Sequence, residues 1–184
     1  MKFETHEQFP ASLKEVRQHG SFSFPCAFYQ AEHDNNPPGF PYIVKHHWHE
    51  QIEIIYLEQD SYQVDINMTV THVKSPCFCF INSGELHALS SDSEKYLEQA
   101  VVFSADMLAF SVPDPVQEEF LLPLSEQKLS FTSFLGYEHP AFNEVQQEFL
   151  KIRSTFRKEN RICMDQLTIE NPVSQLRIKA ALLN

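Results

Sequence analysis

Three histidines and one glutamate are spaced so that their side chains can meet at a single centre. His47 and His49 lie two residues apart, and in a β-strand residues at this spacing point to the same side. Glu53 can join them after a slight bend, and His87, in the run Gly-Glu-Leu-His, supplies a fourth group. Three neutral imidazoles and a carboxylate suit Fe, Ni, Mn or Zn better than metals that prefer thiolates. These four residues are therefore a candidate metal site.

Each of these residues also has an interpretation without a metal. His47 and His49 can line a cavity and hydrogen-bond to each other or to a small molecule. Glu53 can pair with a buried Lys or Arg, or lie in water at a strand end. His87 can be a core histidine with its hydrogen bonds satisfied. The same four residues are therefore also the candidate lining of a ligand pocket.

Several short segments of strand character surround these residues. They cover residues 42–49, 53–57, 62–66, 70–73, 78–81 and 97–103. Asn67 and Met68 mark a turn between two of them, and because Met tolerates positive φ poorly we expect this turn to be wider than two residues. A loop is predicted at 35–39, where Asn, Pro and Gly cluster. So many short strands predict a barrel or sandwich of β-structure.

Beyond about residue 140 the apolar residues take on helical spacing. Steps of three and four separate Phe142, Val145, Phe149, Ile152 and Phe156. This pattern predicts a helix that packs its apolar face on the β-structure. A short basic run along the same stretch, at residues 151–158, is expected to be a solvated helix face.

A second helix is predicted to begin at Asn171, a good N-cap that is followed by a proline. Its apolar row is Val173, Leu176, Ala180 and Leu183, and we expect this row to form a symmetric homodimer interface. The row runs to the last residue without Gly, Pro or a basic final turn. We therefore expect the chain to be a piece of a longer protein, the alternative being a natural end that frays in solvent.

The pattern His47-x-His49-x-x-x-Glu53 resembles the first cupin motif, and Gly84-x-x-His87 resembles the core of the second. More narrowly, residues 47–56 and 80–87 resemble the N-terminal domain of AraC-type (AraC/XylS) transcription regulators. The resemblance continues through residues 100–104 and 120–124 into the two predicted helices. It covers about residues 45–184, nearly all of the predicted ordered chain.

The resemblance implies a mainly β fold, a cupin barrel (a double-stranded β-helix or jelly roll) followed by two C-terminal α-helices. It implies an N-terminal arm at 1–21, a sensor barrel at 22–136 and a helical dimerisation segment at 137–184. In that bacterial family the barrel binds a small effector, often a sugar, and downstream helix-turn-helix units bind DNA. Five positions depart from the cupin motifs, since Asp60, Pro76, Cys77, Asn82 and Ser91 replace the usual Gly, Gly, Asp, Pro and Asn.

The charge of the chain argues against a DNA-binding surface within it. The formal net charge is −11, from 14 basic and 25 acidic residues, and this average field repels a polyanion. The four cysteines, Cys26, Cys77, Cys79 and Cys163, show no Cys-x-x-Cys spacing, which favours buried thiols in a reducing cytoplasm. Cys77 and Cys79 are expected on one face of a strand. We see neither a secretion signal nor a membrane span.

Three classes of function follow from this sequence. The first is an effector-sensing, dimer-forming domain of a regulator, which needs no cofactor and is not an enzyme. The second is a metal-dependent cupin dioxygenase or isomerase that uses His47, His49, Glu53 and His87 to hold a metal with open positions. The third is a storage or structural cupin without a ligand. Metal content and ligand-induced thermal stabilisation would separate them.

Overall fold

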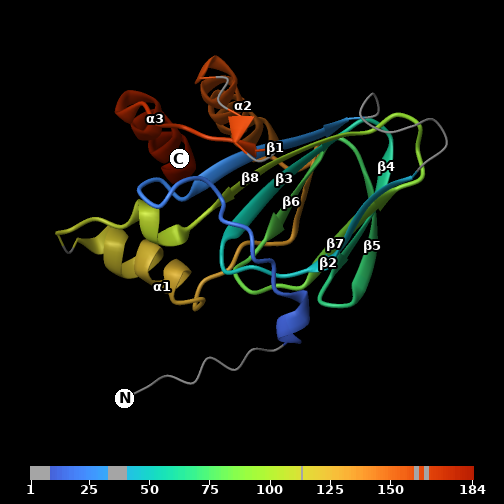
Figure 1. Ribbon diagram of the computed structural model, residues 1–184, viewed down its shortest axis with the longest axis horizontal. Coiled ribbons are helices and arrows are strands. Elements are labelled where there is room, and N and C mark those ends of the chain that lie inside the picture. Colours follow the sequence, from blue (N-terminus) through green and yellow to red (C-terminus); the bar gives the residue numbers. More distant parts are fainter. Residues whose placement is uncertain (1–8, 33–40, 113, 160–161, 164–165) are drawn as a thin grey trace.

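The computed structural model describes residues 9–32, 41–112, 114–159, 162–163 and 166–184. Its strands are β1 (Cys26–Glu32), β2 (Tyr42–His47), β3 (Ile52–Glu58), β4 (Ser61–Ile66), β5 (Thr69–Lys74), β6 (Cys77–Ile81), β7 (His87–Ser91), β8 (Leu97–Phe103), β9 (Phe134–Gly136), β10 (Ile162–Cys163) and β11 (Gln166–Leu167). They form a seven-stranded sheet, β10-β11-β1-β8-β3-β6-β9, and a four-stranded sheet, β2-β7-β4-β5 (Figure 1). All the strand pairs within them are antiparallel.

Helices follow the strands and cover the outer face of the larger sheet (Figure 1). The long helices are α2 (Phe142–Glu159) and α3 (Pro172–Leu183). Shorter turns lie at Ala11–Leu13 and Ala105–Leu108, and a π-helical turn at Gln117–Leu121 leads into α1 (Leu122–Ser125). This is a mainly β, cupin-like sandwich with two C-terminal helices, and the predicted fold class is confirmed.

The larger sheet separates two apolar cores because its side chains alternate between its faces. On β3, Ile52 and Tyr56 pack toward the helices, whereas Ile55 and Leu57 pack between the sheets. On β6, Phe78 belongs to the helix-side core, and Cys77 and Cys79 belong to the inter-sheet core. The two thiols therefore share a face, as predicted. The side chain of Cys163 lies outside the described residues.

Helix α2 buries the face that its spacing predicts. Phe142, Phe149, Ile152 and Phe156 are all buried in the helix-side core, with Val145 partly buried against it. Polar contacts add to this packing, because Arg153 Nη1 donates to Gln99 Oε1 on β8 at 3.1 Å, and Gln99 Nε2 donates to Gln30 Oε1 on β1 at 2.9 Å. The helix is thus attached to the two strands beneath it.

The turn between β4 and β5 is tighter than its sequence suggests. Strand β4 ends at Ile66 and β5 begins at Thr69, so Asn67 and Met68 alone make the connection. Both residues have positive φ, 52° and 66°. The expectation of a wider turn was wrong because the continuous pairing of Ile66 with Thr69 leaves only two residues to connect the strands. The predicted loop at 35–39 lies outside the described residues.

Helix α3 begins at the cap that the sequence indicates. The side chain of Asn171 accepts hydrogen bonds from Val173 N at 2.9 Å and Ser174 N at 3.2 Å. The helix buries Ser174, Ile178 and Ala181, whereas the apolar row predicted for a dimer faces solvent: Val173, Leu176, Ala180 and Leu183. In this single chain that row has no cover among the described residues.

Replacing Asn171 with Ala is expected to lower the free energy of unfolding by about 1 kcal/mol, because two backbone N–H groups at the start of α3 lose their acceptor. Urea denaturation followed by circular dichroism measures the change. Asn143→Ala, an exposed position in the first turn of α2, is the matched control and should leave stability equal or slightly higher. An unchanged midpoint in Asn171→Ala would contradict the capping role.

The cysteines and the helices bear on the redox and membrane expectations. Cys26, Cys77 and Cys79 are buried free thiols. Among the described parts of the chain, none of the helices combines the length and apolar character that crossing a membrane requires.

Candidate functional site

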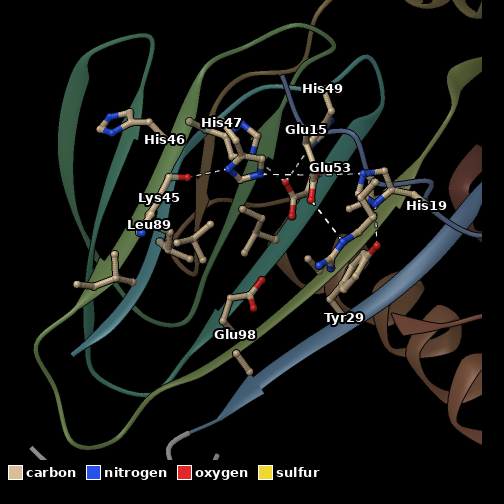
Figure 2. Close-up of a pocket in the computed structure, with 18 of the residues that line it drawn as sticks. Glu15, His19, Tyr29, Lys45, His46, His47, His49, Glu53, Leu89 and Glu98 are labelled. Carbon is tan, nitrogen blue, oxygen red and sulfur yellow. Dashed lines mark hydrogen bonds and ion pairs between the residues drawn. The ribbon is translucent and has the colours of Figure 1, made fainter. Parts of the chain in front are cut away.

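The four predicted site residues come together between the two sheets. His47 at the end of β2 lies opposite His87 at the start of β7, as paired residues of the smaller sheet. His49 follows β2 by two residues, and Glu53 faces inward from β3 in the larger sheet. Figure 2 shows His47, His49 and Glu53 converging on one region. Three of these side chains come from paired strands of the two facing sheets and His49 from the residues after β2, and their function stays a prediction.

The three imidazoles are close enough to share one ion. One ring nitrogen from each of His47, His49 and His87 lies within 4.8 Å of the others. The ring centroids of His47 and His87 are 4.2 Å apart, and those of His49 and His87 are 5.1 Å apart. His49 and His87 are each only 3 % exposed. The cluster is thus a compact set of nitrogen donors, of which only the His47 ring is partly exposed.

Backbone carbonyls fix the same tautomer in all three rings. Nδ1 of His47 lies 2.9 Å from Lys45 O, Nδ1 of His49 lies 3.1 Å from Gln51 O, and Nδ1 of His87 lies 2.9 Å from Glu85 O. A carbonyl oxygen only accepts, so each Nδ1 carries the proton and donates it. In the neutral rings each Nε2 lone pair is then free to bind a metal, the arrangement that backbone partners impose on metal-binding histidines.

Glu53 lies beside two of these Nε2 atoms. Its Oε2 is 3.3 Å from His49 Nε2 and 3.1 Å from His87 Nε2. Burial acts to raise the pKa of Glu53, but the two imidazoles outweigh it and hold this pKa below its usual range. The carboxylate is therefore ionised. The same contact raises the pKa of His87 against the opposing effect of burial.

The negative charge and the lone pairs of these groups favour a positive charge at their centre. If the rings are neutral and oriented by the backbone carbonyls, their lone pairs are directed at the Glu53 carboxylate. This contact is repulsive unless a proton or a metal ion lies between the lone pairs and the carboxylate. His87 Nε2 is buried and has no aligned hydrogen-bond partner among the described residues. Burial and the neighbouring His87 lower the pKa of His47, which favours its neutral, metal-binding form. Three imidazole nitrogens and a carboxylate fit a divalent Mn, Fe, Co, Ni or Zn ion.

A cavity of about 640 Å³ opens from this cluster along the space between the sheets. Glu98 on β8 and Tyr42 on β2 line it away from the histidines, and the Tyr42 hydroxyl donates to Glu98 Oε2 at 3.1 Å. Burial, with a smaller effect of Glu53, raises the pKa of Glu98 to about 8. Glu98 is therefore protonated at neutral pH and can donate a hydrogen bond into the cavity.

Two further polar residues of the cavity come from the N-terminal segment. Glu15 Oε2 is 3.2 Å from His19 Nε2 and 3.9 Å from His47 Nε2. His19 Nδ1 in turn lies 2.7 Å from the Tyr29 hydroxyl (Figure 2). None of Glu15, His19, Tyr42 or Glu98 was predicted from the sequence to be a site residue. Glu98 could have been found from the sequence, because it lies on the inward-facing side of β8, where the other residues are small or apolar.

The neighbours of the cluster have structural roles. His46 turns away from the three rings, and its Nε2 lies 2.9 Å from Asp65 Oδ2 (Figure 2). Trp48 is buried on the other side of the strand, where its Nε1 donates to Pro10 O at 3.2 Å. Glu85 accepts from Asn82 N at 2.8 Å and so fixes the turn before β7.

Comparisons with known proteins give distant likenesses to solved structures. No protein-family model matches this sequence, and a comparison with curated proteins gives no match either. A predicted oxalate decarboxylase from Thermotoga maritima is 28 % identical over 42 % of this chain and 66 % of its own, with a TM-score of 0.36. ToxT from Vibrio cholerae, bound to (E)-4-(8-methylnaphthalen-1-yl)but-3-enoic acid, is 12 % identical over 87 % of this chain and 54 % of its own, with a TM-score of 0.48.

A third solved structure is the Bacillus subtilis oxalate decarboxylase, a protein with Mn(II) centres. It is 18 % identical over 62 % of this chain and 34 % of its own, with a TM-score of 0.35. This chain thus spans less than two thirds of the length of these neighbours, which include both ToxT and decarboxylases. Two facing antiparallel sheets, with paired histidines on their inner surfaces, make this chain a cupin-fold protein.

Proposed function

We propose that this chain is the effector-sensing and dimerisation domain of an AraC-type transcription regulator. A small molecule would bind in the cavity between the sheets, and α3 would pair two copies. The observation that carries the proposal is the polar cavity of about 640 Å³, with imidazoles at one end and the carboxyl group of Glu98, bonded to the Tyr42 hydroxyl, at the other. Such groups donate to and accept from hydroxyls, which suits a polyol or a sugar.

The DNA-binding activity of such a regulator is assigned to a separate helix-turn-helix part. The net charge of −11 gives these 184 residues no electrostatic attraction for DNA. The role proposed for this domain is to change the arrangement of the dimer, and a ligand can do so only as far as it prefers one arrangement over the other.

The ligand-binding part of the proposal is tested by thermal unfolding against a panel of sugars and metabolites. A ligand at 100 times its dissociation constant should stabilise the fold by about 2.7 kcal/mol. Each compound that stabilises the wild type is then tested on Glu98→Gln and His47→Gln, which alter the two ends of the cavity. Compounds that act equally on all three proteins bind elsewhere, and a panel without any cavity-dependent compound would count against the proposal.

The dimer is tested at Leu176, the most exposed large side chain of the α3 row at 67 %. Leu176→Glu is expected to raise the dimer dissociation constant at least about 30-fold, since a central contact is worth about 2 kcal/mol and a buried unpaired carboxylate is costly. Sedimentation velocity measures it. The fold should be unchanged because most of the side chain is exposed in the monomer.

The matched control for this variant is Met68→Glu, the same kind of change at an exposed turn of the smaller sheet. It should sediment like the wild type. Identical dimers for wild type and Leu176→Glu would refute the assignment of this row to self-association.

A second candidate function is a metal-dependent cupin enzyme, a dioxygenase or an isomerase. The specific observation behind it is that the three histidines converge with their tautomers already fixed, and that Glu53 Oε2 lies 3.3 Å from His49 Nε2 and 3.1 Å from His87 Nε2. His47, His49, His87 and Glu53 would hold the ion, which would supply Lewis-acid or redox chemistry when bound. The chain's own groups would orient the substrate, with protonated Glu98 as a hydrogen-bond donor at the far end of the cavity.

The two functions differ in what becomes of a bound compound. Metal content is measured first, by elemental analysis of the purified protein. Compounds that stabilise the metal-loaded protein are then incubated with it in air and followed by NMR. Compounds that remain unchanged favour the sensor, and conversion that stops after chelation favours the enzyme.

A further inference from the structure

The N-terminal segment is joined to the histidine cluster at one place. Glu15 N donates to Trp48 O at 2.9 Å, and Trp48 N donates to Leu13 O at 3.0 Å. Trp48 is the residue between His47 and His49, so the segment is bonded to the chain directly between two of the three imidazoles. This pairing directs the Glu15 side chain into the cavity.

The Glu15 carboxylate lies at the edge of the cluster, on a different side from Glu53. Its Oε2 is 3.9 Å from His47 Nε2, the nitrogen that the carbonyl of Lys45 leaves free for a metal. A second carboxylate thus lies beside the cluster, next to one of its three imidazoles.

His19 holds this carboxylate in place through a chain of buried polar groups. Its Nδ1 lies 2.7 Å from the Tyr29 hydroxyl, which donates to Gln166 Oε1 at 3.0 Å. Its Nε2 faces Glu15 at 3.2 Å, is buried, and lacks an aligned hydrogen-bond partner among the described residues. The ring of His19 also lies edge-on to that of His49, with centroids 5.3 Å apart.

The path of the chain after His19 is fixed by Gly20. Its φ is +72°, and a Cβ there would lie 2.4 Å from Cys26 O, so only glycine fits. Gly20 N donates to the same Gln166 Oε1 at 3.0 Å. The segment that carries Glu15 and His19 is therefore anchored at both ends, by Trp48 and by Gln166.

We infer that Glu15 is an additional ligand of the metal centre, supplied by the N-terminal segment, with His19 as its positioning residue. The inference rests on the metal centre proposed above. With Glu53 it gives two carboxylates to three imidazoles, an oxygen and nitrogen donor set that suits a divalent cation, while Arg17 Nε lies 3.6 Å from the other Glu15 oxygen, Oε1. Binding of the ion thereby fastens residues 13–20 to the cavity wall.

Cobalt(II) is the probe, since its visible absorption reports the ligand set. The wild type should bind one Co²⁺, and Glu15→Gln should bind it roughly 10-fold more weakly with an altered spectrum, because one oxygen donor is lost. Hydrogen exchange read by mass spectrometry gives a second readout. Co²⁺ should slow exchange at residues 13–20 of the wild type and leave these residues unaffected in Glu15→Gln.

Glu50→Gln is the matched control. Glu50 is an exposed carboxylate that pairs with Lys14 Nζ at 2.6 Å, so its loss loosens the same segment without removing a donor from the cavity. It should bind Co²⁺ like the wild type. His19→Gln should lower the Co²⁺ affinity less than Glu15→Gln does, because the Glu15 carboxylate still binds the ion.

The outcomes separate this inference from the metal centre itself. If Co²⁺ binds to the wild type and Glu15→Gln keeps its affinity, spectrum and exchange protection, the role of Glu15 is refuted and the three-histidine centre stands. If the wild type takes up no Co²⁺, the metal centre and the role of Glu15 are both refuted. An equal loss in Glu15→Gln and Glu50→Gln would also overturn the inference, since it would assign the effect to the attachment of the segment.

Discussion

Replacing His87 with Gln is expected to weaken the binding of Co²⁺ or Zn²⁺ by at least about 100-fold. Loss of a supporting hydrogen bond already costs 10- to 100-fold in metal affinity, and this change removes a ligand that is almost fully buried. Glutamine keeps the volume and a polar end, so the sheet pairing of His87 with His47 is retained. Competition with a chelating dye of known affinity measures the change.

His46→Gln is the control for this experiment. His46 neighbours His47 in sequence, yet it faces Asp65 and not the cluster. Its metal affinity should equal that of the wild type. If the two variants bind metal equally well, the buried rings do not form the site, and any bound ion lies on histidines at the surface.

Replacing Glu98 with Gln is expected to stabilise the chain increasingly as the pH rises from about 5 to about 8. Glu98 has a pKa of about 8 in the folded protein against 4.5 for the free side chain, so in this range the folded state binds a proton that the unfolded state has lost. The contribution of Glu98 to stability is complete below pH 4.5 and falls by about 1.4 kcal/mol per pH unit until the folded pKa is passed. Glutamine stays neutral and escapes this loss.

The measured quantity is the difference in the free energy of unfolding between Glu98→Gln and the wild type, taken by urea titration at several pH values. Using the difference cancels the titration of the other groups. It should grow to several kcal/mol near pH 8 and then level off. Glu94→Gln, at the exposed surface, controls for the loss of one negative charge. A difference that is constant over this range would mean that Glu98 is ionised in the folded protein.

The convergence of the four predicted residues could be foreseen because strand geometry is regular. Residues two apart point to one side, so His47 and His49 had to meet whatever lay across the sandwich. That His87 pairs with His47, and that Glu53 comes from the opposite sheet, depended on the cupin resemblance and not on local pattern. Strand β7, which carries His87, was absent from the predicted strands because its sequence, His-Ala-Leu-Ser-Ser, has little strand propensity.

The N-terminal contribution to the site could not be predicted. Glu15 and His19 lie in a polar segment without periodicity, and they reach the cavity through a single bridge to Trp48 and a hydrogen bond from Gly20 to Gln166. Pairings between residues so far apart in the chain cannot be recognised from a short stretch of sequence. Glu98 is different, because an acid on the inward side of an otherwise apolar strand is a visible anomaly.

Turn geometry shows tertiary structure overriding local preference. Asp60 occupies the position of a cupin glycine and still adopts a φ of 59°, and Met68 adopts 66°. Aspartate visits this region at modest cost, whereas methionine does so only because the strands on both sides are paired. The sequence indicated the place of the turn at Asn67 and Met68 but not its width.

The larger sheet is a partition one peptide layer thick between two compartments. Along β8 each step of one residue crosses from one compartment to the other: Glu98 borders the cavity, and the next residue, Gln99, is bonded to Arg153 of α2. The shortest covalent connection between the cavity and the outer helix is therefore the peptide bond between Glu98 and Gln99.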